Sequence, residues 1–214
     1  MTTLVLWRHG QTDYNLAGRV QGRVDIPLND TGRAQAAAAA PGLAALGPSL
    51  VVCSPLERAH GTARELGALT GLSVTIDDGL LERSFGVWEG LDRAAMEKGW
   101  PEEFALWRAG GDPAGVGVET RAHAAERVGG TLARIADDAP EDATVVVAAH
   151  GAAITLGTTH LLGLDPAGWF GLRGLDNCHH ATLRRTDRAP GWVLVEWNAG
   201  GGDTEPGTPA AFVS

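Results

Sequence analysis

Two histidines occupy similar places in the sequence, each just after an apolar run and directly before a glycine, with only Arg8 between the run and the histidine in the first case. His9 follows the run at 4–7, and His150 follows the run at 144–149. A single histidine at the end of a strand is more often structural than catalytic. Both runs are typical of buried strands, however, and ligands of α/β proteins bind beyond the carboxyl ends of such strands. The repeated pattern therefore predicts that both imidazoles belong to one site.

Two arginines accompany the histidines and indicate the kind of ligand. Arg8 immediately precedes His9, and Arg58 falls in the first turn of a helix expected after another apolar run at 50–53. Arg58 taken alone would be interpreted as a solvated surface residue. A guanidinium group pairs two-on-two with phosphate oxygens, and a helix N-terminus adds free backbone N–H groups. Together with the histidines, the arginines form a set of donors suited to a phosphoryl group.

The elements that must position these residues alternate between strand and helix. A helix is expected at 31–46 with Thr31 as its N-cap, and another at 55–70 with proline in its first turn. This alternation predicts an α/β fold, a three-layer α/β/α sandwich with a mostly parallel central sheet. The other expected elements are strands at 4–7, 50–53, 73–76 and 144–149, helical pieces at 91–98 and 101–109, helices at 119–138 and 151–163, and two final antiparallel strands at 181–186 and 192–197.

Length and composition limit the domain organisation and the classes of partner. The 214 residues are enough for one domain, expected at 1–198, and a flexible tail at 199–214. The formal net charge of −9 argues against nucleic acid or an anionic membrane as a partner. We expect a cytoplasmic protein, because neither a spanning segment nor a signal peptide is evident. Cys53 and Cys178 form no CxxC pair, which predicts two buried thiols and no zinc site.

Five segments in chain order resemble the signature of a known family. They are Leu6–Asn15 (LWRHGQTDYN), Gln21–Leu28 (QGRVDIPL), Ser54–Ala59 (SPLERA), Leu81–Gly90 (LERSFGVWEG) and Ala149–Gly151 (AHG). The ordered series resembles the histidine phosphatase (phosphoglycerate mutase-like) superfamily, branch 1, over residues 3–198. Within it, the run at 9–15 is similar to that of actinobacterial glucosyl-3-phosphoglycerate phosphatases. The resemblance implies the same three-layer fold.

The resemblance also implies a role for each matched residue. His9 would attack phosphorus and become a phosphohistidine, while Arg8, Arg58 and His150 hold the phosphoryl oxygens. Glu82 would give a proton to the leaving oxygen and later take one from water. These roles suit phosphoryl transfer, which needs positioning, positive charge and an acid, and the cations supply the charge without a metal ion or other cofactor. The expected substrate-binding residues are Asn15, Gln21, Gly22, Gly151 and His179. Members of the family often form dimers, so the resemblance also admits a homodimer.

Several residues keep two interpretations. Glu119 either supports the site or is a carboxylate at a helix N-terminus, and Glu89 is expected to be a structural partner of its loop. His179 and His180 either shape the substrate pocket or lie on the surface. Four aromatic residues belong either to a core or to a substrate wall: Trp88, Trp100, Phe104 and Trp107.

Three functions compete. We favour a phosphatase that hydrolyses a small phosphate monoester, such as a sugar phosphate or a phosphoglycerate derivative. The alternative is a cofactor-dependent phosphoglycerate mutase. The family's mutases usually carry a longer insert with additional cations, whereas residues 91–118 contain only Arg93, Lys98 and Arg108, which favours water as the acceptor. A non-catalytic phosphate-binding module is less favoured, because nucleophile, acid and arginines are all present.

Overall fold

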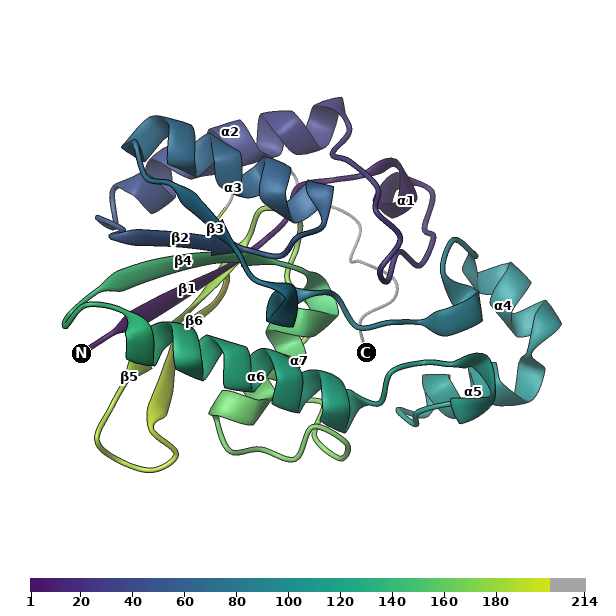
Figure 1. Ribbon diagram of the computed structural model, residues 1–214. Helices are drawn as coiled ribbons and strands as arrows, with labels where there is room; N and C mark the ends of the chain where they lie inside the picture. The colour runs from purple at the N-terminus through teal and green to yellow at the C-terminus, as the bar shows by residue number, and fades with distance from the viewer. Residues whose placement is uncertain (201–214) are drawn as a thin grey trace.

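The computed structural model describes residues 1–200, in which six strands form one sheet between helices (Figure 1). The strands are β1 (Thr3–Arg8), β2 (Leu50–Cys53), β3 (Val74–Ile76), β4 (Thr144–Ala149), β5 (His180–Arg185) and β6 (Trp192–Ala199). Their spatial order is β3-β2-β4-β1-β5-β6. The pairs β2–β3, β2–β4 and β1–β4 are parallel, whereas β5 runs antiparallel to β1 and to β6. The mostly parallel sheet is confirmed.

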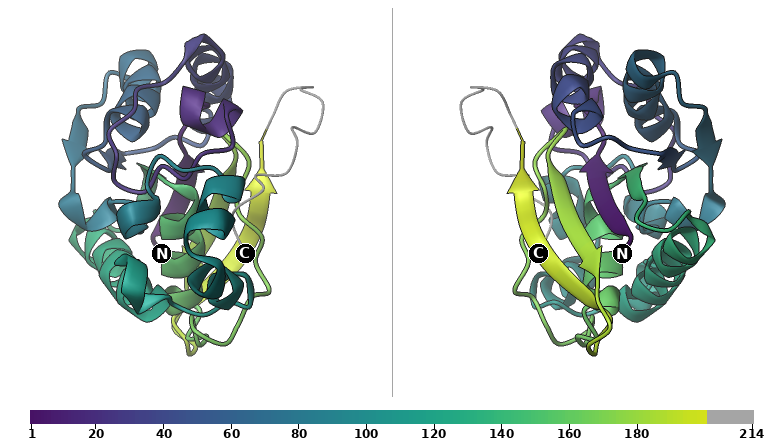
Figure 2. Two further views of the ribbon diagram at one scale, coloured as in Figure 1. Left: turned by 90° about the vertical axis from the view of Figure 1, so that its right-hand side faces the viewer. Right: turned by 90° about the vertical axis from the view of Figure 1, so that its left-hand side faces the viewer.

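Helices cover both faces of this sheet, as Figure 2 shows with α2 and α3 on one face and α6 and α7 on the other. The helices are α1 (Asp13–Leu16), α2 (Asp30–Ala44), α3 (Glu57–Thr70), α4 (Arg93–Gly99), α5 (Pro101–Arg108), α6 (Arg121–Asp138) and α7 (Gly151–Leu161). Within residues 1–200, no helix is long and apolar enough to cross a membrane. The tail expected at 199–214 lies, from residue 201 on, outside the described residues, and its separation from the domain stays a prediction.

The two helical layers create two cores that share the central strands. In β1, Leu4 and Leu6 pack into the core under α6 and α7, while Val5 and Trp7 pack into the core under α2 and α3. All four side chains are at most 1% exposed. Successive side chains of a strand point to opposite faces, so a strand covered on both faces must be apolar throughout. The expected buried thiols are confirmed, since Cys53 and Cys178 are both buried and unpaired.

Four helix starts differ from the sequence-based expectation. Helices α4 and α6 begin at Arg93 and Arg121, two residues later than expected. Asn29, and not Thr31, caps α2, because its side chain accepts from the backbone N–H of Gly32 at 2.9 Å. Helix α3 begins at Glu57, because Leu56 keeps an extended backbone (φ −67°, ψ 134°) that excludes residue 55 from the helix. The expectation that matters for the site is confirmed, since Arg58 lies in the first turn of α3.

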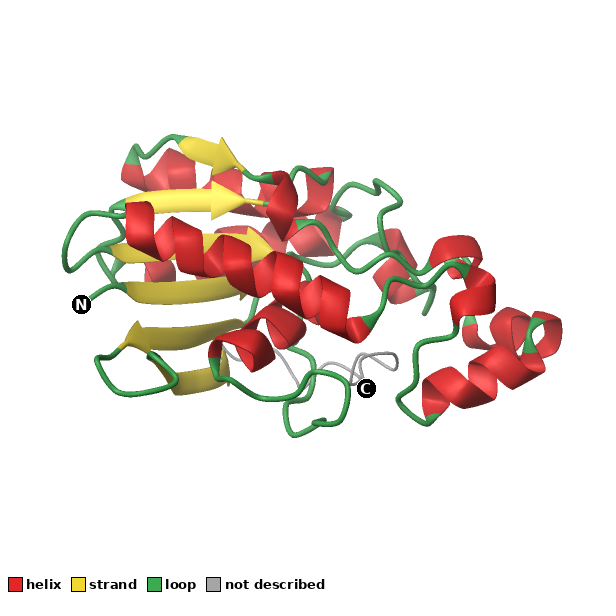
Figure 3. Ribbon diagram, turned by 60° about the horizontal axis from the view of Figure 1, so that its bottom comes forward, coloured by secondary structure: helices red, strands yellow, loops and turns green. Residues whose placement is uncertain are grey.

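The segment between β3 and α6 lies beyond the carboxyl ends of the parallel strands, and Figure 3 shows α4 and α5 standing apart from the sheet. Its aromatic residues form a small core of their own. Trp88, Phe104 and Trp107 are at most 5% exposed, and the Trp88 ring lies 6.3 Å from Phe104 and 5.9 Å from Trp107. Trp100 is half-buried against the same cluster. The aromatic set is therefore a structural core.

Candidate active site

The two histidines emerge side by side from neighbouring parallel strands. In the register of β1 and β4, Arg8 lies opposite Ala149, so the next residues are His9 and His150. Their ring centroids are 5.3 Å apart, and the side chains are 2% and 0% exposed. The prediction that both imidazoles meet at one edge of the sheet is confirmed.

The hydrogen bonds of His9 fix its tautomer. Its Nδ1 lies 2.7 Å from the carbonyl oxygen of Gly10. A carbonyl oxygen can only accept, so Nδ1 carries the proton and Nε2 keeps its lone pair. Burial, followed by the charges of Arg58 and Arg8, lowers the pKa of His9 well below its ordinary value. At neutral pH the ring is therefore uncharged, which is the state that a nitrogen nucleophile requires.

Arg58 joins the second histidine to the loop after α1. Its Nε donates to His150 Nδ1 at 3.2 Å, and its terminal nitrogens donate to the carbonyl oxygens of Val24 at 2.8 Å and Gly22 at 2.7 Å. Because His150 Nδ1 accepts, its Nε2 carries the proton and donates to Ser54 Oγ at 2.7 Å. Burial lowers the pKa of Arg58 to about 10, so the group keeps its charge at neutral pH.

Arg8 adds a second buried cation to the cluster. The residue is 5% exposed, and one terminal nitrogen donates to the carbonyl oxygen of Leu175. Its buried Nε has no hydrogen-bond partner anywhere in residues 1–200. Within the same range, neither Arg8 nor Arg58 forms an ion pair with a carboxylate. Buried charges that form no ion pair are costly, so this arrangement is suited to an anionic ligand.

Glu82 reaches the same place from the irregular segment after β3. Its Oε1 accepts from the backbone N–H groups of Arg83 and Ala153, each at 2.8 Å, and its Oε2 accepts from that of Ala152 at 3.2 Å. These alanines lie in the first turn of α7, whose N-cap is His150. A carboxylate at a helix N-terminus is stabilised by free N–H groups and by the helix dipole. The alanines act through their backbone, so their side chains gave no signal in the sequence.

Comparison with known proteins agrees with this geometry. Residues 4–200 match the model of the histidine phosphatase superfamily, branch 1. The chain belongs to this superfamily. A glucosyl-3-phosphoglycerate phosphatase of Mycobacterium tuberculosis is 39% identical over 210 residues, covering 92% of this chain and 94% of the relative. The phosphoserine phosphatase 1 of Hydrogenobacter thermophilus is 32% identical over 192 residues, covering 88% and 89%.

A solved structure extends the similarity to the fold. The mycobacterial glucosyl-3-phosphoglycerate phosphatase in complex with VO3 superimposes with a TM-score of 0.84 at 39% identity, covering 92% of this chain and 99% of the other. The family membership and the fold class that the sequence motifs implied are therefore confirmed. The expectation of a phosphatase for small phosphate esters is confirmed at the level of the histidine phosphatase family and its named relatives.

Residues of the segment 12–21, which follows His9, are joined by a series of side-chain hydrogen bonds. Thr12 Oγ1 donates to Gln21 Oε1 at 2.8 Å, and the Thr12 backbone N–H donates to Asn15 Oδ1 at 3.1 Å. Asn177, which sequence reasoning missed, donates to the carbonyl oxygen of His9 at 2.9 Å and to Asn15 Oδ1 at 3.4 Å. The structure thus links the predicted Asn15 and Gln21 to the nucleophile's backbone.

The two predicted glycines lie beside the groups that form the site. Gly22 has a φ of +51°, and a Cβ there would lie 2.2 Å from Glu89 Oε1. Its carbonyl accepts from Arg58, so the glycine lets this loop close over the arginine. Gly151 is buried at the first position of α7, between His150 and the N–H groups that bind Glu82. Glu89 accepts from the Phe85 backbone at 3.0 Å, as expected for a structural partner of its loop.

The histidines before β5 contribute differently. The carbonyl oxygen of His179 accepts from the backbone N–H of Arg8 at 2.9 Å, so its main chain adjoins the site. Its ring, however, pairs through Nδ1 with the carbonyl oxygen of Asn198 at 3.0 Å. His180 Nε2 lies 3.9 Å from a carboxylate oxygen of Glu196 on β6. The structure therefore directs both rings to β6, and a substrate contact of His179 stays a prediction.

Proposed function

We propose that this chain is a phosphatase that hydrolyses small phosphate monoesters through a phosphohistidine on His9. The observation that carries the proposal is the buried cluster around His9. Its Nδ1 is bonded to the Gly10 carbonyl, which leaves the lone pair on Nε2, and neither Arg8 nor Arg58 forms an ion pair with a carboxylate of residues 1–200. A phosphate dianion would balance these cations. Charge aimed at the equatorial oxygens is the main requirement of phosphoryl transfer.

The reaction divides into two balanced steps. In the first, His9 Nε2 forms a bond to phosphorus, the ester P–O bond breaks, and the leaving oxygen takes a proton from protonated Glu82, which is left as the carboxylate that the N–H groups of α7 stabilise. The Gly10 carbonyl, already bonded to Nδ1–H, stabilises the positive charge that develops on the ring. In the second step Glu82 takes a proton from water, the water oxygen bonds to phosphorus and the P–N bond breaks. The products are an alcohol, inorganic phosphate and the original neutral His9.

The two oxygens of Glu82 are held unequally, and this supports an assignment of the acid oxygen. Oε1 accepts two backbone hydrogen bonds of 2.8 Å, whereas Oε2 accepts one of 3.2 Å. A proton on Oε1 would compete with two short bonds, and a proton on Oε2 with only the longer one. We therefore assign Oε2 as the oxygen that carries the transferred proton.

The substrate class follows from the relatives. They are named for glucosyl-3-phosphoglycerate and phosphoserine, which are both monoesters of small polar alcohols. We propose a sugar phosphate or a phosphoglycerate derivative as the substrate of this chain. The low number of cations in the insert supports water rather than a second substrate as the acceptor.

Phosphate release from a panel of monoesters tests the proposal. The panel contains glucosyl-3-phosphoglycerate, 3-phosphoglycerate, phosphoserine and p-nitrophenyl phosphate, with His9→Ala as the matched variant. We expect release by the wild type and none by the variant. Interconversion of phosphoglycerates with little release would show a mutase. A rise in Tm with inorganic phosphate, without turnover of any ester, would show a binding module.

We further propose that the reaction needs no metal ion, because the two arginines supply the positive charge and His150 adds a neutral N–H donor. Among residues 1–200, no group of three His, Cys, Asp or Glu side chains could hold one. Unchanged kcat/KM after dialysis against EDTA is the expected result, and restoration of lost activity by a divalent cation would contradict it. The cytoplasmic location, the homodimer and the lack of a nucleic-acid partner stay predictions.

A further inference from the structure

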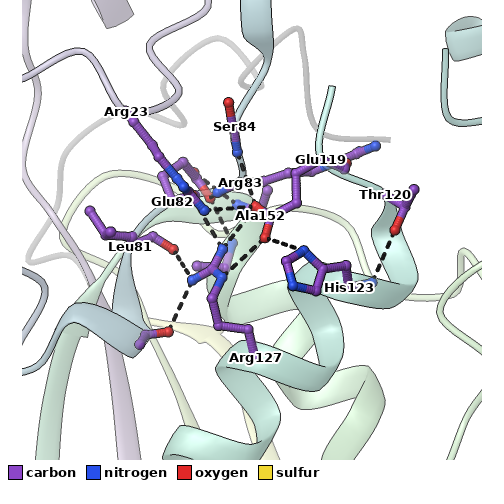
Figure 4. Close-up of polar contacts among 12 residues, drawn as sticks. Arg23, Leu81, Glu82, Arg83, Ser84, Glu119, Thr120, His123, Arg127 and Ala152 are labelled. Carbon is purple, nitrogen blue, oxygen red and sulfur yellow. Dashed lines mark hydrogen bonds and ion pairs between the residues drawn. The ribbon is translucent and has the colours of Figure 1, made fainter. Parts of the chain in front are cut away.

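A cluster of charged residues lies behind Glu82, on the side of its backbone (Figure 4). It contains Arg127 from α6, Glu119 from the segment before α6, and Arg23 from the loop after α1. We call it the Arg127 cluster. Two of its members were not singled out by the sequence, and Glu119 had two competing interpretations.

Arg127 uses every donor of its guanidinium group within this cluster. Its Nε donates to Glu119 Oε1 at 3.1 Å, and one terminal nitrogen donates to the carbonyl oxygens of Gly79 at 3.0 Å and Leu81 at 2.8 Å. The other terminal nitrogen donates to Glu119 Oε2 at 2.9 Å and to the Glu82 carbonyl at 3.4 Å. Guanidinium has five N–H donors in a fixed plane. One side chain therefore binds three carbonyl oxygens, those of Gly79, Leu81 and Glu82 itself.

Glu119 holds the cluster together from the opposite side. Its side chain is 6% exposed and also accepts from the Ser84 backbone N–H at 3.1 Å and from Arg23 at 3.2 Å. Burial raises the pKa of Glu119, but the hydrogen bonds and charge of Arg127 outweigh this effect and keep the pKa below its ordinary value. The carboxylate therefore stays ionised and keeps Arg127 in its orientation.

The position of Glu82 thus depends on two helices at once. Its backbone is fixed to α6 by Arg127, and its carboxylate is bound to the N-terminus of α7. The two helices pack through a cluster of small and apolar side chains, namely Ala124, Ala125, Ala152 and Leu156. Glu82 itself follows a short 3-10 helix (Asp78–Leu80) and lies in no strand, so no ladder of hydrogen bonds holds it.

We infer that Arg127, oriented by Glu119, is a positioning residue for proton transfer by Glu82; the inference rests on the acid role assigned to Glu82 in the proposed function. Arg127 touches neither the phosphoryl group nor the leaving oxygen in this account. It sets the distance between the acid and the leaving oxygen. Displacement of a reacting group by 1 Å can lower a rate by about 10²-fold, so loss of this anchor should be visible in the kinetics.

The test compares two substrates that differ in their need for an acid. Dinitrophenolate leaves 2,4-dinitrophenyl phosphate without a proton, whereas the alkoxide of phosphoserine needs one. The quantity compared is kcat/KM, because it covers the steps up to the phosphohistidine and excludes its hydrolysis. Arg127→Lys keeps the charge but cannot span the five acceptor contacts. We expect kcat/KM to fall about 10–100-fold for phosphoserine, and less than about 3-fold for the dinitrophenyl ester.

Matched variants separate the inference from the proposed function. Arg134 lies on the same helix two turns later and forms ion pairs with Asp77 and Asp138. The control variant Arg134→Lys should therefore keep wild-type kcat/KM for both esters. Glu82→Gln should show the full leaving-group dependence. If Glu82→Gln lowers both esters equally, the acid assignment is wrong. If Glu82→Gln behaves as expected while Arg127→Lys lowers both esters equally, or neither, only the positioning role is overturned. Glu119→Gln gives the same comparison should Arg127→Lys not fold.

Discussion

Gly10→Ala should displace the nucleophile without changing any group that takes part in the reaction. A Cβ on Gly10 would lie 2.4 Å from the backbone carbonyl oxygen of Gly32 on α2, about 1 Å short of an ordinary contact of 3.4 Å. The carbonyl oxygen is a backbone atom and the Cβ is attached directly to the backbone of residue 10, so no side-chain rotation can relieve the contact. The Gly10 carbonyl also binds His9 Nδ1, so the displacement passes directly to the nucleophile. An error of 1 Å in the attack geometry costs about 10²-fold.

The assay is kcat/KM at a temperature well below the Tm of the variant, for both 2,4-dinitrophenyl phosphate and phosphoserine. The two values should fall together by about 10²-fold, because His9 attacks phosphorus in the same step in which either leaving group departs. Gly42→Ala is the control, since it lies on the same helix with nothing within 4 Å of its added Cβ. It should keep full activity and lose no stability. Wild-type kcat/KM in a folded Gly10→Ala variant would refute the argument from close packing.

The remaining predictions concern pH and Arg58. Burial lowers the pKa of His9 and His150 in the folded protein, so the unfolded chain takes up protons first as the pH falls below 6.5. Tm should therefore decrease from pH 7 to pH 5, because each histidine lowers the free energy of unfolding by on the order of 1 kcal/mol per pH unit. A constant Tm would contradict the burial of these histidines as neutral rings. For the same reason, the acid limb of kcat/KM for 2,4-dinitrophenyl phosphate should lie below pH 6.5. Arg58→Lys should lower kcat/KM for both esters by about 10²–10³-fold and abolish the rise of Tm with inorganic phosphate. The reason is that a lysine cannot form hydrogen bonds to His150, Gly22 and Val24 at the same time. If the variant keeps both properties, Arg58 does not belong to the phosphate site.

The sequence predicted those parts of the site that follow from strand ends. Buried runs before His9 and His150 placed both imidazoles at one edge of the sheet, because the carboxyl ends of parallel neighbours coincide. The first turn of α3 likewise placed Arg58 near them. The family motifs added Glu82. It lies in an irregular segment, so the periodicity of apolar residues could not predict its position in the site.

The parts that the sequence did not predict depend on backbone atoms. Ala152 and Ala153 bind Glu82 through backbone N–H groups, which all residues except proline possess. Arg127 binds backbone carbonyl oxygens, which every residue has, so the residue types at these positions give no signal. The cap of α2 was misplaced because Asn29 and Thr31 are both good N-caps. A tertiary contact favours the first, since its backbone N–H donates to the Gln11 carbonyl at 3.1 Å.

Trapping the covalent intermediate tests the central claim most directly. Wild-type protein is mixed with radiolabelled phosphoserine, quenched in base within milliseconds, digested, and the labelled peptide is sequenced by mass spectrometry. We expect one acid-labile, base-stable phosphoryl group on His9, absent from His9→Ala and longer-lived in Glu82→Gln. Turnover of the ester with the label on another residue, or on none during steady-state hydrolysis, would contradict it.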